Sequence, residues 1–268
     1  MKDFKGKTAV ITGAGSGIGR ALASELSDLG CNLALSDIDE AGLVETASML
    51  NGTGRVETWR VDVSDRLAMG QFASDAIAAF GAVDIVINNA GVALEGLFED
   101  NSYDELEWIL GVNLWGVIHG CKEFIPHLKT RPEASLVNIS SLFGILTVPA
   151  FSAYQISKFG VRGLTEALRQ ELKGTGIAVT CVHPGGIKTS IARNLRSSTK
   201  QGDEYEEFVD AYEKNFITTA ESAAKTIVRG IRKKQARVLV GMDAKIFDRV
   251  ARAMPGSYER VVGLVSDL

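Results

Sequence analysis

The chain is poor in cysteine, histidine and proline, and it has no long apolar run. Its 268 residues include three cysteines, three histidines and five prolines. The cysteines are far apart and odd in number, so we expect no disulfide framework and a reducing, cytoplasmic location. The histidines lack a paired spacing, so we expect no metal site and interpret them as packing or surface residues. Neither a secretory signal nor a membrane-spanning helix is predicted.

The net charge and the composition further restrict the class of protein to which the chain can belong. The net charge of −4 argues against a nucleic-acid binder, which normally carries a basic face. With 46% apolar and 23% charged residues, the chain can bury a sizeable core. No linker or repeat is visible, and we therefore expect a single domain over residues 1–268.

Short β-branched runs alternate with longer amphipathic stretches along most of the chain. The predicted strands are Thr8–Ile11, Asn32–Ser36, Val56–Arg60, Asp84–Asn88, Ser135–Ile139, Ala178–His183 and Arg237–Val240. The predicted helices cover about Gly17–Leu29, Glu40–Leu50, Asp65–Phe80, Tyr103–Leu128 and Ala153–Lys173. This alternation predicts a Rossmann-like α/β fold, a doubly wound, mostly parallel sheet of about seven strands.

The pattern changes in the last third of the chain. After a core at 1–190, residues 190–217 are polar and irregular, and we interpret them as a substrate loop. A helix and the strand Arg237–Val240 follow, and then a predicted C-terminal helical extension at 243–268.

A glycine-rich turn follows the first predicted strand. Glycines alternate at positions 13, 15, 17 and 19 within Thr12–Gly19, where a helix begins. Glycine lets the backbone approach a pyrophosphate closely, and the free N–H groups of a helix N-terminus attract the anion. The spacing departs from the strict G-x-G-x-x-G fingerprint because position 18 is Ile. Its place in a βαβ unit still predicts a dinucleotide site.

Asp37 at the end of the second strand bears on the choice of dinucleotide. It follows Gly17 by 20 residues, where an acidic side chain reaches the adenosine ribose hydroxyls. A 2′-phosphate at 4 Å from this carboxylate would face a repulsion of about 4 kcal/mol per charge pair at an effective dielectric of about 20. No Arg or Lys occurs at positions 36–41, and Arg20 sits a turn into the first helix. We expect NAD as the cofactor, with use of NADP left open.

Tyr154 and Lys158 are the predicted centre of the chemistry. They are four residues apart on a predicted helix, so their side chains share a face. A tyrosine with a pKa near 10 must lose about 2–3 units to exchange protons near neutrality. A lysine ammonium and a positively charged nicotinamide ring can supply that stabilisation. Chance alone gives roughly 0.3 such pairs in a chain of this composition, so the pair needs its context.

Six further segments supply that context in a fixed order. They are Thr12–Gly19, Asp62-Val63, Asn88-Asn-Ala-Gly91, Asn113 in an Asn-x-x-Gly segment, Asn138-Ile-Ser-Ser141 and Pro184-Gly-Gly-Ile-Lys-Thr189. Together with the Tyr-x-x-x-Lys pair, these motifs resemble those of the short-chain dehydrogenase/reductase family over about residues 5–190.

The resemblance implies a role for each matching residue. Tyr154 would exchange the proton with the substrate oxygen, and Lys158 would bind the nicotinamide ribose and lower the pKa of the tyrosine. Ser141 would hydrogen-bond the substrate oxygen, with Ser140 as the runner-up. Asn113 would hold a water in a proton relay, with a structural role in the helix as its alternative. The implied cofactor-binding residues are Gly13, Ser16, Gly17, Ile18, Asp37, Asp62, Val63, Asn89, Ala90, Tyr154, Lys158, Pro184, Gly185, Ile187 and Thr189. Of these, Ile187 and Thr189 would hold the nicotinamide carboxamide, and Asn89 would steady the edge of the sheet under the cofactor.

These features predict an oxidoreductase that interconverts an apolar secondary alcohol and its ketone by hydride transfer with NAD(H). An enoyl reductase and a non-catalytic dinucleotide-binding module remain as alternatives. The apolar preference follows from the residues that we expect at the substrate mouth. These are Leu94, Leu97, Phe98, Leu142, Phe143, Val148, Phe151 and Ile191, and we expect about half of them to pack in the core instead.

The C-terminal segment departs from the family pattern. Many bacterial members end shortly after the seventh strand, whereas 27 residues follow Gly241 here. This puts the common homotetramer in doubt and leaves a homodimer through the helices at 103–128 and 153–173. Residues 225–260 carry ten Lys and Arg against three Asp and Glu, which is +7 locally. We interpret the segment as a cover for the cleft or a subunit interface, with a weak contact to an anionic membrane surface as the alternative.

Overall fold

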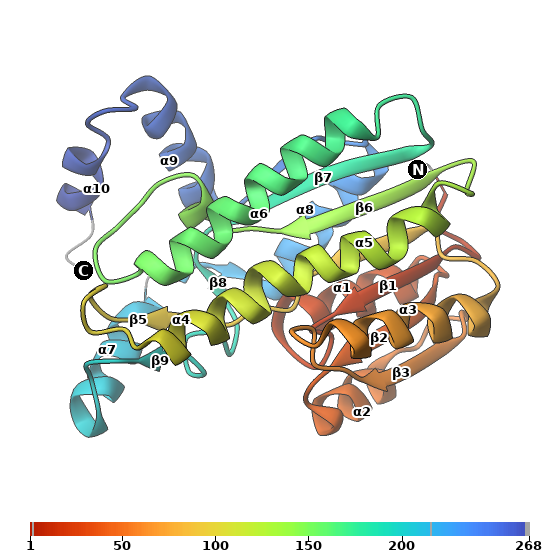
Figure 1. Ribbon diagram of the computed structural model, residues 1–268, viewed down its shortest axis with the longest axis horizontal. Coiled ribbons are helices and arrows are strands. Elements are labelled where there is room, and N and C mark those ends of the chain that lie inside the picture. Colours follow the sequence, from red (N-terminus) through yellow and green to blue (C-terminus); the bar gives the residue numbers. More distant parts are fainter. Residues whose placement is uncertain (2, 215, 266–268) are drawn as a thin grey trace.

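Seven parallel strands form the central sheet of the computed structural model, which describes residues 1, 3–214 and 216–265. Position 215 of the predicted substrate loop and positions 266–268 of the predicted extension lie outside the described residues. The strands are β1 (Thr8–Thr12), β2 (Asn32–Asp37), β3 (Val56–Arg60), β4 (Ile85–Asn88), β6 (Ala134–Ile139), β7 (Ile177–Pro184) and β11 (Arg237–Val240). Their order across the sheet is β11-β7-β6-β4-β1-β2-β3, and each pairing is parallel (Figure 1).

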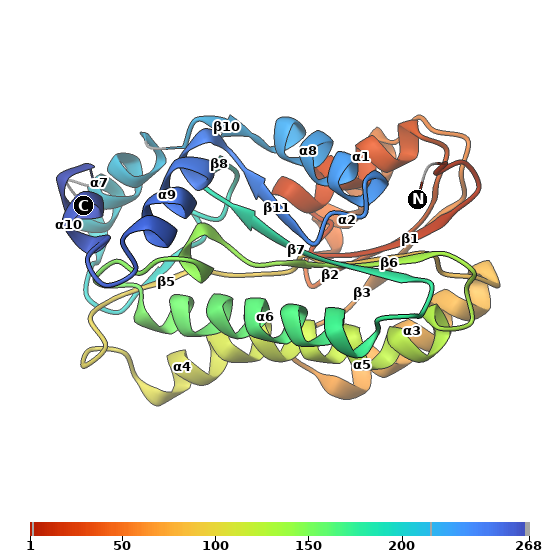
Figure 2. The ribbon, with the colours of Figure 1, turned by 90° about the horizontal axis from the view of Figure 1, so that it is seen from above.

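Helices cover both faces of this sheet, as Figure 2 shows. One layer holds α1 (Gly17–Asp28), α2 (Glu40–Met49) and α8 (Ala220–Arg232). The other holds α3 (Arg66–Phe80), α5 (Gly116–Leu128) and α6 (Ser152–Glu171). Because both faces are covered, β1, β4 and β6 are buried along their whole length. The predicted doubly wound α/β fold is confirmed.

One predicted helix is interrupted. The stretch predicted as a single helix over Tyr103–Leu128 consists of α4 (Tyr103–Leu110), a π-helical turn at Gly111–Trp115 and α5. Such turns insert an extra residue into the helical ladder and often occur at functional sites. Asn113 lies inside this turn, and its side chain is fully buried.

The segment at 190–217 is more regular than the sequence interpretation allowed. It contains α7 (Gly202–Lys214), and the short strands β8 (Ile187–Lys188), β9 (Arg196–Ser197) and β10 (Thr218–Thr219) lie around it. The strand β9 pairs with β5 (Leu94–Glu95), and β10 pairs with β8. The prediction of an irregular loop is therefore wrong for α7, whose apolar side chains pack against other parts of the chain.

Two helices follow the last strand, α9 (Met242–Ala253) and α10 (Glu259–Val265). They lie beside the segment that joins β6 to α6, at the same end of the molecule as α7 (Figure 1). None of the helices in the described part of the chain is long and apolar enough to cross a membrane.

The strand order reverses direction beside β1. The chain moves from β1 outward to β2 and β3, and it then returns to β4 on the other side. In sheets of this kind, ligands bind at the carboxyl ends of the strands where the order reverses. The fold therefore directs attention to the segments that follow β1 and β4.

Candidate active site

A large cavity lies at the carboxyl ends of these strands, with a volume of about 860 Å³. It brings together most of the predicted site residues. Those that line it are Gly13, Ser16, Gly17, Ile18, Asp37, Asp62, Val63, Asn89, Ala90, Ser141, Tyr154, Lys158, Pro184, Gly185, Ile187 and Thr189. Asn113 is not among the lining residues.

The glycine-rich turn forms one end of the cavity and is packed too tightly for side chains. A Cβ atom at Gly19 would overlap the carbonyl oxygen of Gly13, and one at Gly13 would lie 2.7 Å from Cα of Ala90. Ser16 precedes α1 in an extended conformation, and its side chain does not cap the helix. The backbone and the first-turn amides of α1 therefore remain open to an anion, which fits a dinucleotide pyrophosphate.

Asn89 ties this turn to the end of β4. Its side-chain amide donates to the carbonyl oxygens of Thr12 and Gly13 at 2.9 and 3.0 Å. In return, the Thr12 hydroxyl accepts from the backbone amides of Asn89 and Ala90 at 3.0 and 3.1 Å. Asn89 thus holds the glycine-rich turn to the end of β4.

Asp37 lies where an adenosine ribose would be expected. Its carboxylate accepts hydrogen bonds from the amides of Gly15 at 2.8 Å and Asp39 at 3.0 Å. Arg20 is turned toward α2 instead, because its guanidinium donates to Glu45, Thr46 and the Gly15 carbonyl oxygen. The guanidinium of Arg20 is thus already engaged.

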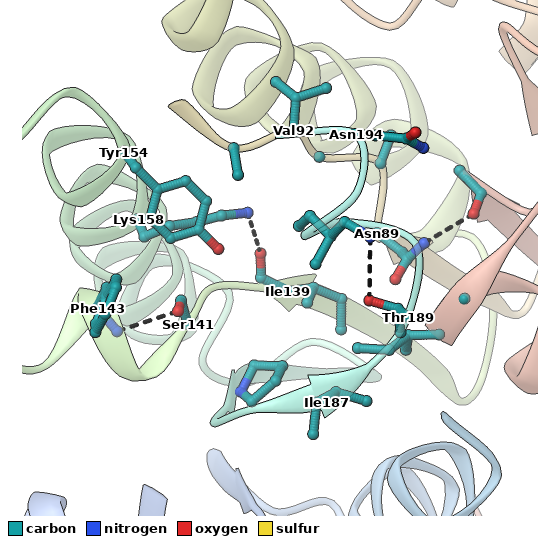
Figure 3. Close-up of a pocket in the computed structure, with 18 of the residues that line it drawn as sticks. Asn89, Val92, Ile139, Ser141, Phe143, Tyr154, Lys158, Ile187, Thr189 and Asn194 are labelled. Carbon is teal, nitrogen blue, oxygen red and sulfur yellow. Dashed lines mark hydrogen bonds between the residues drawn. The ribbon is translucent and has the colours of Figure 1, made fainter. Parts of the chain in front are cut away.

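Tyr154, Lys158 and Ser141 meet at the other end of the cavity (Figure 3). Tyr154 and Lys158 project from the first two turns of α6, and Lys158 Nζ lies 5.6 Å from the centre of the tyrosine ring. The same Nζ donates to the carbonyl oxygen of Ile139 at 3.2 Å. Ser141 follows β6, and its side chain lies close to the Tyr154 phenol.

Burial sets the protonation of this cluster. It lowers the pKa of Lys158 to about 8. It also raises the pKa of Tyr154, and the nearby Ser141 hydroxyl offsets this only in part. The expected lowering of the tyrosine pKa is therefore not a property of the protein without its cofactor, since desolvation of the phenolate outweighs the nearby groups.

The two adjacent serines have different partners. The Ser140 hydroxyl donates to the backbone carbonyl of Lys158 at 2.8 Å and is buried. Ser141 faces Tyr154, so the geometry favours Ser141 over Ser140 as the substrate contact.

His183 supports Ser141 from behind, a contact that sequence interpretation missed. Its Nδ1 lies 3.0 Å from the Ser141 carbonyl oxygen, which requires the Nδ1–H tautomer because a carbonyl only accepts. Burial lowers the pKa of His183 to about 4, so the ring is neutral near pH 7. The position of His183 at the end of β7, level with the end of β6, was its only signal in the sequence.

Asn113 does not line the cavity but is hydrogen-bonded to Val92, which does. Its side-chain oxygen accepts from the Val92 amide at 2.8 Å, and its amide group donates to the Val92 carbonyl and to Ser157. A Cβ atom at Gly91 would lie 3.2 Å from the Asn113 oxygen and 3.3 Å from Lys158 Nζ, so both groups flank this glycine. These bonds fit the structural alternative, and the water relay stays a prediction.

Apolar and aromatic side chains surround the Tyr154 end of the cavity. Of the expected mouth residues, Leu142, Phe143, Val148, Phe151 and Ile191 line it. Leu94 is buried in the core, and Leu97 and Phe98 are exposed to solvent. The sequence interpretation missed Tyr212 of α7 and Phe216, which lies just after α7. Phe247 of α9 and Val262 of α10 also line the cavity, and both belong to the segment that we interpreted as a cover for the cleft.

Comparisons with known proteins agree with the motifs. Residues 7–200 match the family model described as short chain dehydrogenase. SadH of Mycobacterium tuberculosis, named as an oxidoreductase, is 47% identical over 266 residues, which are 98% of this chain and 96% of SadH. The chain belongs to the short-chain dehydrogenase/reductase family of oxidoreductases.

Solved structures support the same assignment. A short-chain dehydrogenase/reductase from Burkholderia phymatum, crystallised in complex with NAD, matches with a TM-score of 0.88 and 31% identity over 95% of this chain and 96% of that one. Levodione reductase matches with a TM-score of 0.79 and 28% identity, over 90% of this chain and 97% of its own.

Proposed function

We propose that this protein interconverts an apolar secondary alcohol and its ketone, with NAD(H) as the cofactor. The observation that carries the proposal is the meeting of the Tyr154 phenol and Ser141 at the end of an apolar chamber. An apolar cavity favours binding of an apolar substrate, because the substrate surface is removed from water there. The hydroxyl groups of Tyr154 and Ser141 would orient its single oxygen. Phe143 and Phe151 form the nearest walls, with ring centres 5.5 Å apart.

The charge of the cavity supports NAD over NADP. Asp37, Asp39 and Asp62 line the end where the adenosine would lie, and among the described lining residues Lys158 is the sole Lys or Arg. A 2′-phosphate at that end would meet carboxylates without a compensating cation. The complex of the Burkholderia phymatum relative with NAD is consistent with this choice.

The residues at the chamber's end can carry the proton. When bound, a nicotinamide dinucleotide supplies or accepts the hydride at the reacting carbon. In ketone reduction, the substrate oxygen gains negative charge, and hydrogen bonds from Ser141 and Tyr154 would stabilise it. The Tyr154 phenol would then give its proton to that oxygen. Because burial raises its pKa, Tyr154 is held as the phenol that this step requires.

Lys158 would hold the cofactor ribose and place a positive charge beside the phenol. Its position 5.6 Å from the Tyr154 ring supports that role in the reverse reaction, where a phenolate must form. With its pKa lowered to about 8, the ammonium group can also release a proton near neutrality. Once deprotonated, Lys158 could accept the proton that Tyr154 takes from an alcohol.

A pair of tyrosine variants tests the proposal. The wild type is assayed with NADH and a panel of apolar ketones, small charged keto acids and enoyl thioesters. We expect turnover of the apolar ketones, and a loss of about 100-fold or more in Tyr154→Phe with NADH still bound. Tyr103→Phe is the matched control, because this phenol is exposed on α4 and outside the cavity.

The alternatives give different results. Preference for enoyl thioesters would assign the site to enoyl reduction, and NADH binding without any turnover would leave a dinucleotide-binding module. Far better turnover of small charged acids would refute the apolar substrate class. More than a few per cent of activity in Tyr154→Phe would refute the role of the phenol.

We further propose that the protein forms a homodimer through α5 and α6. Trp115, Ile156 and Phe159 are large apolar residues on or next to these helices, and all three are exposed in the single chain. Contact with a second copy would bury them. A Phe159→Glu variant should then lower the mass measured by light scattering from that of a dimer to that of a monomer.

A further inference from the structure

The C-terminal helices contact the active-site cavity from two directions. Phe247 of α9 and Val262 of α10 line the cavity. They belong to an apolar cluster with Leu142 and Leu146, in the segment that follows Ser141. The same part of the chain also reaches the opposite side, where the turn after β7 would contact the nicotinamide.

Asp243 makes that second contact. It lies in the first turn of α9, lines the cavity, and accepts a hydrogen bond from the backbone amide of Gly186 at 2.6 Å. A Cβ atom at Gly185 or at Gly241 would overlap the Asp243 carboxylate. Two turns of the backbone therefore close around this side chain, and the bond to an ionised acceptor is of the stronger kind.

The anchored turn leads directly to the residues that we expect at the nicotinamide. Gly186 is followed by Ile187, which pairs with Thr218 in the short β8–β10 ladder. Two residues further on, Thr189 packs against Gly17 of the glycine-rich turn. The packing is close, since a Cβ atom at Gly17 would lie 3.1 Å from the threonine methyl group. A shift of Gly186 would be transmitted along this short segment to the cofactor.

The body of the protein holds α9 in place. Asp248, one turn and a half further along α9, is buried and forms ion pairs with Arg237 of β11 at 2.6 Å and with Arg252 at 3.1 Å. Beyond α9, the Tyr258 hydroxyl lies 2.8 Å from the Thr147 hydroxyl and accepts from its backbone amide at 3.2 Å. This C-terminal part of the chain is thus fixed to β11 at one point and to the segment between β6 and α6 at another.

We propose that Asp243 is a positioning residue that holds the Gly185–Gly186 turn in place against the nicotinamide half of the cofactor. Tyr258 in turn positions, through Thr147, the segment between β6 and α6 that lines the substrate end of the cavity. Residues 242–262 then form a strap that spans the cleft and acts separately on each bound molecule. The inference rests on the proposed cofactor, but it concerns binding and does not depend on which substrate is turned over.

Calorimetric titration of two ligands tests the role of Asp243. NADH has both halves of the cofactor, whereas ADP-ribose lacks the nicotinamide. For Asp243→Ala we expect the NADH dissociation constant to rise about tenfold, since one charge-assisted hydrogen bond is lost. The dissociation constant of ADP-ribose should stay within twofold. Asp243→Asn keeps an acceptor oxygen and should recover most of the NADH affinity.

Asp104→Ala provides the matched control, because Asp104 also lies in the first turn of a helix but is exposed on α4. It should leave both dissociation constants unchanged. If Asp243→Ala binds NADH as the wild type does, or weakens NADH and ADP-ribose equally, the positioning role is refuted. A wild type that binds no NADH would instead refute the proposed function.

Tyr258→Phe tests the other end of the strap. It removes the hydroxyl that meets Thr147 while the aromatic ring remains. We expect the KM for the ketone to rise several-fold, with the NADH dissociation constant and kcat unchanged. An unchanged KM, or a parallel loss of NADH affinity, would show that the two contacts do not act separately and would overturn that half of the proposal.

Discussion

Replacement of Lys158 by methionine should make the protein more stable and abolish turnover. The ammonium group is buried, and its pKa of about 8 lies about 2.5 units below the ordinary value of 10.5. At about 1.4 kcal/mol per unit, burial of the charge costs about 3 kcal/mol of folding free energy at pH 7. Methionine matches the length of lysine and carries no charge to desolvate.

One contact works against that gain. Lys158 Nζ donates to the Ile139 carbonyl, and its loss costs about 1 kcal/mol. The net expectation at pH 7 is a gain of about 2 kcal/mol for Lys158→Met. The pKa of the lysine is depressed in the folded state, so its contribution to stability improves as pH rises from about 8 toward 10.5. At pH 9.5 the advantage of the methionine variant should nearly disappear.

Urea unfolding of the cofactor-free protein at pH 7 and pH 9.5 measures both effects. Lys122→Met on α5 is the control, because this lysine is exposed and its removal should change stability little at either pH. The reasoning fails if Lys158→Met is less stable than the wild type at pH 7. It also fails if the gain is the same at both pH values, since the buried charge would then not be its source.

Three further outcomes follow from the site and its surroundings. The ratio of kcat/KM for NADH to that for NADPH should exceed one and should fall in Asp37→Ala; equal use of both cofactors by the wild type would contradict the role of Asp37. The pH profile of kcat/KM should lack an inflection near 6.5, because the pKa of His183 is lowered to about 4, and an inflection that vanishes in His183→Gln would contradict this. Sedimentation with anionic vesicles at low salt should leave the protein in solution. Of the apolar side chains on α9 and just after it, Phe247 and Ala251 pack inward, which leaves Ile246 and Met254 exposed to a membrane surface. Salt-sensitive binding lost on deletion of 243–268 would instead support the membrane contact.

Local patterns in the sequence predicted the fold well. The strand at Val56–Arg60 has the predicted bounds, and the strand that starts at Thr8 is one residue longer than predicted. Such runs are covered on both faces, so their apolar character is continuous and easily distinguished. The glycine-rich turn was equally clear, because close backbone packing leaves no substitute for glycine at Gly19.

The substrate side was harder to predict for a physical reason. Tyr205, Phe208, Val209 and Tyr212 recur at helical spacing, but the acidic residues between them made α7 look like a polar loop. The apolar stripe has meaning only once its packing partners from other segments are known. In the same way, the hydrogen bond between Gly186 and Asp243 joins residues 57 positions apart, and no local sequence pattern predicts it.

The separation of the chamber's walls from its proton-carrying groups affects how the enzyme can diversify. Tyr154, Lys158 and Ser141 are carried by the central sheet and α6, whereas Tyr212 of α7, Phe247 of α9 and Val262 of α10 contribute only to the wall. Laboratory evolution could therefore exchange residues such as Tyr212 or Phe247 to admit other carbon skeletons while the chemistry is retained. Libraries confined to these three helices should yield altered selectivity more often than libraries spread over the sheet.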